Sequence, residues 1–199
     1  MKSFNSLVHY IWVGDGQIPE TFKQNYRKTQ ELNPGYQFQI WTDEKIVPLL
    51  GDFEEIYRRS SIFHKLQLGR YLVLDQKGGI CCDFDIEWKV PFDSIYSIFE
   101  ECDLIFTRRN SFYSYSTPEK IYLLDDYVIF AKSGLTKKYI EYCLTRTNSK
   151  KDESEPFSPY ALTEWCMNNQ KVKYFDSNQI YDDKNCSLAY HYNERTWAR

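Results

Sequence analysis

Residues 70–85 read RYLVLDQKGGICCDFD, a stretch that combines a helix, a stop and a strand. Apolar side chains recur every three or four residues in this region, which predicts a helix over residues 60–76. Gly78 and Gly79 supply the C-terminal stop of that helix. Residues 80–86 are apolar at first and acidic at their end, so we expect a buried strand there.

Asp83 and Asp85 stand at the carboxyl end of this expected strand. Residues i and i+2 of a strand share a face, so both carboxylates are expected to converge while Phe84 points into the core. Ligands of open α/β sheets bind beyond the carboxyl ends of the strands. Two carboxylates there suit Mg²⁺ or Mn²⁺, which bridge to phosphate oxygens. The alternative is a pair of solvated acids, but the cost of burying unpaired acids favours a metal site.

The flanking sequence alternates between strand and helix patterns. Further strands are expected at 7–13, 36–41, 104–106, 127–131 and 172–175, and further helices at 19–32, just after Thr42 or Asp43, and at 135–144 and 158–169. Residues 148–155 are expected to form a solvated loop. This alternation indicates an α/β fold, with helices flanking a central mixed, mainly parallel sheet.

Composition limits the class of protein. A chain of 199 residues suits one domain over 1–199, and its 42% hydrophobic and 27% charged residues exclude a disordered, collagen-like or coiled-coil protein. The net charge of −3 offers no global field for nucleic acid. The six cysteines lack zinc-site spacing and are expected to be buried, reduced thiols. The apolar run 7–13 is too short to span a membrane, so we expect a cytoplasmic protein without a membrane span.

Three blocks of the sequence resemble one enzyme family. The DXD-containing glycosyltransferases of family 32, and the catalytic domains of large glucosylating bacterial toxins, carry the pattern S-D-x-x-R-x-x-x-L-x-x-x-G-G-x-Y-x-D-x-D. The residues that match it in type and spacing are Arg70, Leu74, Gly78, Gly79, Asp83 and Asp85. Residues 9–14 (HYIWVG) are similar to the family's N-terminal H-x-[IV]-W-[IV]-G. His191 followed by Thr196-Trp197 is similar to its C-terminal block.

The resemblance implies a single domain with a GT-A-like fold and a retaining, metal-dependent hexosyltransferase activity. The donor would be a UDP- or GDP-sugar, the acceptor a hydroxyl of a glycan or glycoconjugate, and the cofactor Mn²⁺ or Mg²⁺. The metal ligands would be Asp85, which binds directly, Asp83, which binds through water or holds sugar hydroxyls, and His191. Arg70 would hydrogen-bond the donor sugar or its phosphate.

The resemblance also implies a donor pocket. Trp12 would stack on or flank the base, Ile11 and Val13 would shape the pocket, and Trp197 would cover the pyrophosphate. The alternative is that Trp12 is a core residue of its strand. His9 is expected to be a core histidine whose hydrogen bonds are satisfied within the protein.

Two positions depart from the family pattern, and the role of a second acidic pair stays open. Gln67 replaces the family aspartate that accepts sugar hydroxyls, although it shares a helix face with Arg70 and belongs with the donor-binding candidates. Cys81 replaces the family tyrosine. These changes keep a second hypothesis open, a degenerate transferase that binds nucleotide sugars without turnover. Asp125 and Asp126 are candidates for contact with sugar hydroxyls or the reacting centre, or else form an acidic turn before a strand.

A different enzyme class also uses D-x-D after an apolar strand. In phosphohydrolases of the haloacid dehalogenase type, the first aspartate is a nucleophile near the N-terminus. Here the motif lies past residue 80 and is followed by Ile86-Glu87-Trp88, which disfavours that class.

Overall fold

A computed structural model of the chain describes residues 6–98, 102–113, 121–147, 157–168, 171–176, 178–181 and 185–192. The helices are α1 (Glu20–Leu32), α2 (Asp43–Ile46), α3 (Glu54–Arg59), α4 (Ile62–Lys77), α5 (Lys137–Thr147) and α6 (Pro159–Met167), with short 3₁₀ helices η1 (Val47–Leu49), η2 (Gly51–Phe53) and η3 (Phe92–Ile98). The strands are β1 (Leu7–Ile11), β2 (Gln37–Trp41), β3 (Gly79–Cys82), β4 (Ile86–Trp88), β5 (Leu104–Tyr113), β6 (Ile121–Ala131), β7 (Val172–Phe175), β8 (Ile180–Tyr181) and β9 (Ala189–His191).

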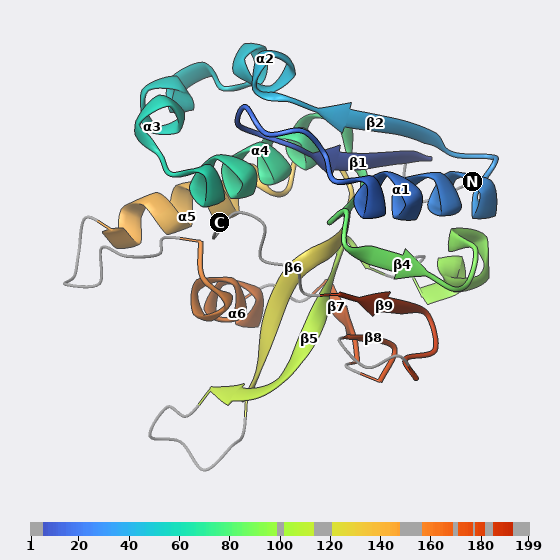
Figure 1. The fold of residues 1–199 in the computed structure, drawn as a ribbon. Coiled ribbons are helices and arrows are strands. Elements are labelled where there is room, and N and C mark those ends of the chain that lie inside the picture. Colours follow the sequence, from blue (N-terminus) through green and yellow to red (C-terminus); the bar gives the residue numbers. More distant parts are fainter. Residues whose placement is uncertain are drawn as a thin grey trace.

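The described strands form two sheets (Figure 1). The larger has the order β2-β1-β3-β6-β5-β7, in which β2, β1 and β3 are parallel, β6 is antiparallel to both β3 and β5, and β7 is parallel to β5. The smaller has the order β4-β9-β8. The expected mixed, mainly parallel α/β sheet is therefore confirmed. No helix of the described residues is long and apolar enough to cross a membrane.

An apolar core covers each face of the larger sheet. One core packs α4, α5 and α6 against the sheet, and the other packs α1 and the smaller sheet against it. Adjacent residues of β3 face opposite ways, because Cys81 belongs to the first core and Cys82 to the second, as predicted for a strand. All six cysteines lie in the described residues and are buried, unbridged thiols.

The strand boundaries differ from the expected ones in two places. β1 ends at Ile11, so Trp12 and Val13 lie in the segment that follows it. β5 and β6 extend well past the expected 104–106 and 127–131, because they pair with one another along their outer parts (Figure 1). The helices expected at 19–32, 60–76, 135–144 and 158–169 are present as α1, α4, α5 and α6. The expected loop 148–155 lies outside the described residues.

The double glycine lets β3 enter the sheet directly after α4. Gly78 and Gly79 have φ values of 63° and 102°, which side chains other than glycine rarely adopt. A Cβ on Gly79 would lie 2.4 Å from the carbonyl oxygen of Leu7 in the neighbouring β1. A Cβ on Gly78 would lie 2.9 Å from the backbone nitrogen of Ser133. Glycine is therefore required at both positions by conformation and by space.

Gly79→Ala is expected to lower the free energy of unfolding by more than about 3 kcal/mol, because it adds backbone strain to a clash with a fixed backbone atom. Gly35→Ala is the matched control, since a Cβ there meets no atom within 4 Å. It is expected to leave stability unchanged or to raise it by up to about 1 kcal/mol. Urea unfolding of both variants measures the difference, and equal stabilities would contradict this account of the double glycine.

His9 is a core histidine with both ring nitrogens engaged. Its Nε2 lies 2.8 Å from the carbonyl oxygen of Gly78, and Trp41 Nε1 donates to its Nδ1 at 3.1 Å. The ring is therefore neutral, with its proton on Nε2. Burial lowers the pKa of His9 to about 4, which the contact with Gly78 only partly offsets. The interpretation of His9 as a satisfied core residue is confirmed.

The free energy of unfolding should depend on pH through the titration of His9. Its pKa is about 4 when folded and about 6.5 in an unfolded chain. The unfolded state therefore binds more protons between these values, and stability falls as the pH falls through that window. The contribution of neutral, buried His9 to the free energy of unfolding is fully present above about pH 6.5 and amounts to about 3 kcal/mol. Relative to His9→Gln, whose amide does not titrate, wild type should lose this amount between pH 7 and pH 4. Parallel stability curves from urea unfolding would contradict the prediction.

Candidate metal and donor site

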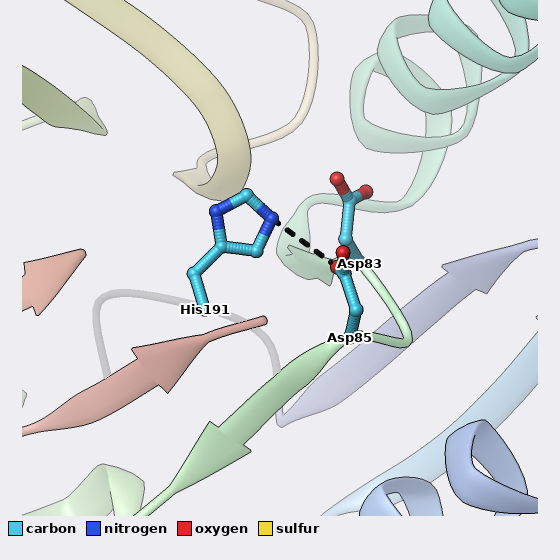
Figure 2. Close-up of side chains that lie close together, drawn as sticks. All are labelled: Asp83, Asp85 and His191. Atoms are coloured by element: carbon cyan, nitrogen blue, oxygen red, sulfur yellow. Dashed lines mark ion pairs between the residues drawn. The ribbon is translucent and has the colours of Figure 1, made fainter. Parts of the chain in front are cut away.

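Three predicted ligands meet beyond the end of β3. Asp83, Asp85 and His191 each offer a ligand atom, and these atoms all lie within 4.8 Å of one another. Figure 2 shows His191 reaching from β9 toward the two carboxylates, with its Nε2 3.3 Å from Asp85 Oδ1. Backbone pairing sets this geometry: His191 pairs with Ile86 across β4 and β9, and Tyr192 N–H donates to the Asp85 carbonyl at 2.9 Å.

The two aspartates converge through a turn and not through a strand, so the expected strand at 80–86 was wrong in this detail. β3 ends at Cys82, and the chain bends at residues 83–85 before it enters β4 in the smaller sheet. Ile86 N–H donates to the Asp83 carbonyl at 3.3 Å across this bend. Phe84 points into the core, as predicted, where its ring contacts Tyr10. The bend presents both carboxylates at the junction of the two sheets.

The electrostatics of this cluster are strongly coupled. Burial alone would lower the pKa of His191, but Asp85, Asp83 and Asp125 together raise it above its usual value. Burial raises the pKa of Asp83, Arg70 opposes this, and the nearby Asp85 adds to the rise. Several acids therefore crowd one small region, and a cation there would relieve their repulsion.

Arg70 joins the turn to the sheet. The guanidinium of this buried residue is ion-paired with Asp83, and its Nη1 lies 3.1 Å from Asp126 Oδ1. Nη1 also donates to the Asp126 carbonyl. Burial would lower the pKa of Arg70, but the two aspartates raise it, so Arg70 stays charged. Arg70 thus contacts two carboxylates and one backbone carbonyl of the described residues, and its contact with a donor stays a prediction.

The carboxylate of Asp126 accepts hydrogen bonds from side chains on one face of α4. Gln67 Nε2 donates to its Oδ1 at 3.3 Å, and the Tyr71 hydroxyl donates to its Oδ2 at 2.8 Å, in addition to Arg70. Gln67, Arg70 and Tyr71 occupy positions i, i+3 and i+4 and so share that face. The buried amide of Gln67 is thus directed at Asp126, while its Oε1 has no hydrogen-bond partner among the residues that the structure describes. Asp126 acts here as the anchor that orients Arg70.

An irregularity in β6 places the second acidic pair. The register with β5 shifts between the pairs Ile105↔Phe130 and Thr107↔Asp125, so β6 carries extra residues there. Such bulges re-aim side chains and occur next to active sites. Asp125 and Asp126 lie inside β6 and not in a turn before it, which corrects the alternative of an acidic turn. Asp126 faces α4, whereas Asp125 is among the acids that act on His191.

The residues of the turn and β9 fit a divalent cation. Two carboxylates and one imidazole suit Mn²⁺, and the carboxylates also suit Mg²⁺. Among the described residues, this is the group of acidic, histidine and cysteine side chains that meets the spacing of a metal site. Asp83, Asp85 and His191 would hold the ion.

The residues of the expected base pocket lie at the end of β1. Ile11 and Val13 are buried in the core shared with α4. Trp12 is half-buried, with its ring edge-on to Phe84 at 5.8 Å and its Nε1 donating to the Gly16 carbonyl at 2.6 Å. Phe84 therefore links Trp12 to the turn that carries the aspartates. Trp197 lies outside the described residues.

The loop after β1 is fixed by an aspartate that the sequence did not single out for function. Asp43 accepts from the Gly14 N–H at 2.6 Å through Oδ2 and from the Tyr57 hydroxyl at 2.7 Å through Oδ1. These bonds attach the loop that contains Trp12 to α2 and α3. Tyr71 was also missed, although its position four residues after Gln67 on the same helix face was a usable signal.

The fold and the site define a class of protein. A mixed α/β sheet with a D-x-D turn beyond a buried strand is a GT-A-like architecture. Two solved structures are similar to it in fold: "PaToxG Glycosyltransferase", with a TM-score of 0.54 and 17% identity over 81% of this chain and 68% of that one, and a glycosyltransferase involved in the glycosylation of the major capsid of PBCV-1, with a TM-score of 0.55 and 11% identity over 96% of both chains.

The sequence comparisons agree with this class. Residues 19–100 match the family model described as "Glycosyltransferase sugar-binding region containing DXD motif". The chain is 30% identical over 107 residues to inositol phosphoceramide mannosyltransferase 1 of Schizosaccharomyces pombe. That match covers 49% of this chain and 33% of the relative, so the chain spans about a third of the relative's length. The resemblance to the DXD-containing glycosyltransferases is confirmed.

Proposed function

We propose that this protein is a metal-dependent retaining glycosyltransferase that moves a hexose from a UDP- or GDP-sugar to a hydroxyl of a glycan or glycoconjugate. The observation that carries the proposal is the convergence of Asp83, Asp85 and His191 at the edge of a GT-A-like sheet. A divalent cation bound there would supply the positive charge that offsets the leaving diphosphate. The relative's name makes mannose the first sugar to test, with GDP-mannose as its donor.

The proposed reaction breaks the bond between the anomeric carbon and the diphosphate oxygen and forms a bond from that carbon to the acceptor oxygen. In a retaining transfer on one face, the departing phosphate oxygen takes the proton of the acceptor hydroxyl, so no dedicated base is required. Arg70 contributes a permanent positive charge and orients Asp83 through their ion pair. Preorganised charge of this kind lowers the barrier without reorganisation during the reaction.

A covalent route would need a carboxylate on the opposite sugar face, and Asp125 is the better candidate of the acidic pair. Asp126 is held by Gln67, Arg70 and Tyr71, which leaves it little freedom to act on a sugar. Asp125 is buried on the bulge of β6, and its Oδ1 accepts from the Asp126 N–H at 3.1 Å.

A reducing compartment such as the cytoplasm suits this chain, since its six cysteines are unbridged thiols. A nucleic-acid partner is not expected, because positive and negative residues are nearly balanced, at 25 and 28.

A panel of nucleotide sugars tests the proposal. UDP-glucose, UDP-galactose, UDP-N-acetylglucosamine and GDP-mannose are each incubated with the protein and Mn²⁺, and release of the nucleoside diphosphate is scored. We expect turnover of at least one donor and its loss on chelation with EDTA. Binding of a donor without any turnover would favour the alternative, a nucleotide-sugar-binding module, for which Gln67 in place of the family's aspartate is the motivating observation.

A further inference from the structure

Tyr127 contacts each of the segments that carry the three ligands. Its carbonyl oxygen accepts from the Asp83 N–H at 2.9 Å, which holds the start of the turn. Its ring stacks on His191, with ring centroids 4.3 Å apart and planes inclined by 26°. Its hydroxyl donates to the Ile180 carbonyl at 3.1 Å, on β8, the strand paired with β9. A single buried residue of β6 therefore joins the larger sheet to the part of the smaller sheet that bears His191.

The stacked ring restricts the imidazole of His191. Backbone pairing with Ile86 sets where the His191 backbone lies, but it leaves the rotation of the ring open. Asp85 contacts one edge of the imidazole at Nε2, and the Tyr127 ring covers its flat face. With both contacts in place, Nε2 stays directed at the carboxylates. A ligand that is already oriented loses less conformational entropy when it binds a metal.

We propose that Tyr127 is a positioning residue that fixes His191 as a ligand and thereby sets the affinity of the site for a divalent cation. The inference rests on the metal site of the proposed function. It adds a residue outside the three proposed ligands, on the stretch of β6 where the register with β5 shifts. Supporting residues of this kind typically change metal affinity by roughly 10- to 100-fold.

Binding of Mn²⁺ alone, followed by the electron paramagnetic resonance of free Mn²⁺, tests the proposal without any substrate. Tyr127→Leu removes the stacked ring and the hydroxyl and is expected to weaken binding roughly 10- to 100-fold. Tyr127→Phe restores the ring and should recover most of that loss. Phe92→Leu is the matched control, because Phe92 is an equally buried aromatic residue that packs on Trp88 and Phe130, away from the ligands. Its affinity for Mn²⁺ should equal that of wild type.

The remaining outcomes separate this proposal from the proposed function. If wild type binds Mn²⁺ and Asp85→Ala does not, but Tyr127→Leu binds as wild type does, the role of Tyr127 is refuted and the metal site stands. If wild type binds no Mn²⁺, both are refuted.

Proton spectra of the histidine rings provide a test that does not depend on the folding of Tyr127→Leu. The chain has three histidines, so the signal of His191 is identified by its loss in His191→Gln. Stacking predicts that this signal is shifted upfield in wild type and in Tyr127→Phe. An unshifted signal in wild type would overturn the proposal.

Discussion

Asp85→Ala is expected to reduce release of nucleoside diphosphate by at least about 10²- to 10³-fold at saturating donor and Mn²⁺, the range seen when one preorganised group that stabilises transition-state charge is removed. Asp85 is buried and contacts His191, so its loss would remove one proposed ligand and free the ring of a second. The effect should appear in Mn²⁺ affinity as well as in turnover. Steady-state kinetics and Mn²⁺ titration of the purified variant measure both.

Asp52→Ala is the matched control, since Asp52 is an exposed aspartate of η2, away from the turn. It should leave turnover and Mn²⁺ affinity unchanged. Turnover by Asp85→Ala at the level of Asp52→Ala would refute the assignment of Asp85 as a metal ligand.

Arg70→Met should have the largest effect on stability of any charge removal in the described part of the chain. Arg70 is buried between Asp83 and Asp126, and the variant would leave these acids, with Asp85 nearby, without their counter-charge. Breaking a buried ion pair from one side typically costs about 3–5 kcal/mol. Because the site becomes more negative, Mn²⁺ affinity should be retained or increased while turnover falls. Urea unfolding and Mn²⁺ titration test the two statements separately.

Arg59→Met provides the comparison for that prediction. Arg59 pairs with Glu55 at 2.7 Å on α3, but its side chain is 80% exposed. An exposed pair contributes at most about 1 kcal/mol. Equal losses of stability in the two arginine variants would contradict the central position given to Arg70.

Local sequence signals predicted much of the fold and the convergence of the candidate metal ligands. The periodicity of α4, its double-glycine end and the short apolar strand after it were all readable, because each depends on residues close together in the chain. The convergence of Asp83 and Asp85 was also predicted, although for the wrong geometric reason. A strand and a tight turn both bring residues i and i+2 together, and nothing in the sequence distinguished the bend into β4 from a continuing strand.

The tertiary arrangement around the ligands could not be predicted in the same way. Asp126 meets Arg70 across 56 residues of chain because β6 pairs next to β3 and carries a bulge. The stack of Tyr127 on His191 joins residues 64 positions apart, on strands of different sheets. These contacts depend on sheet order and register, which single-sequence periodicity does not encode.

The central claim is that a cation held by Asp83, Asp85 and His191 anchors the diphosphate of the donor. The most direct measurement is the affinity for the nucleoside diphosphate itself, UDP and GDP in turn, by calorimetry with and without saturating Mn²⁺. The account predicts that Mn²⁺ tightens binding of one of them by roughly 5- to 150-fold, and that Asp85→Ala abolishes this coupling. Affinities that are the same with and without Mn²⁺ for both nucleotides would contradict it.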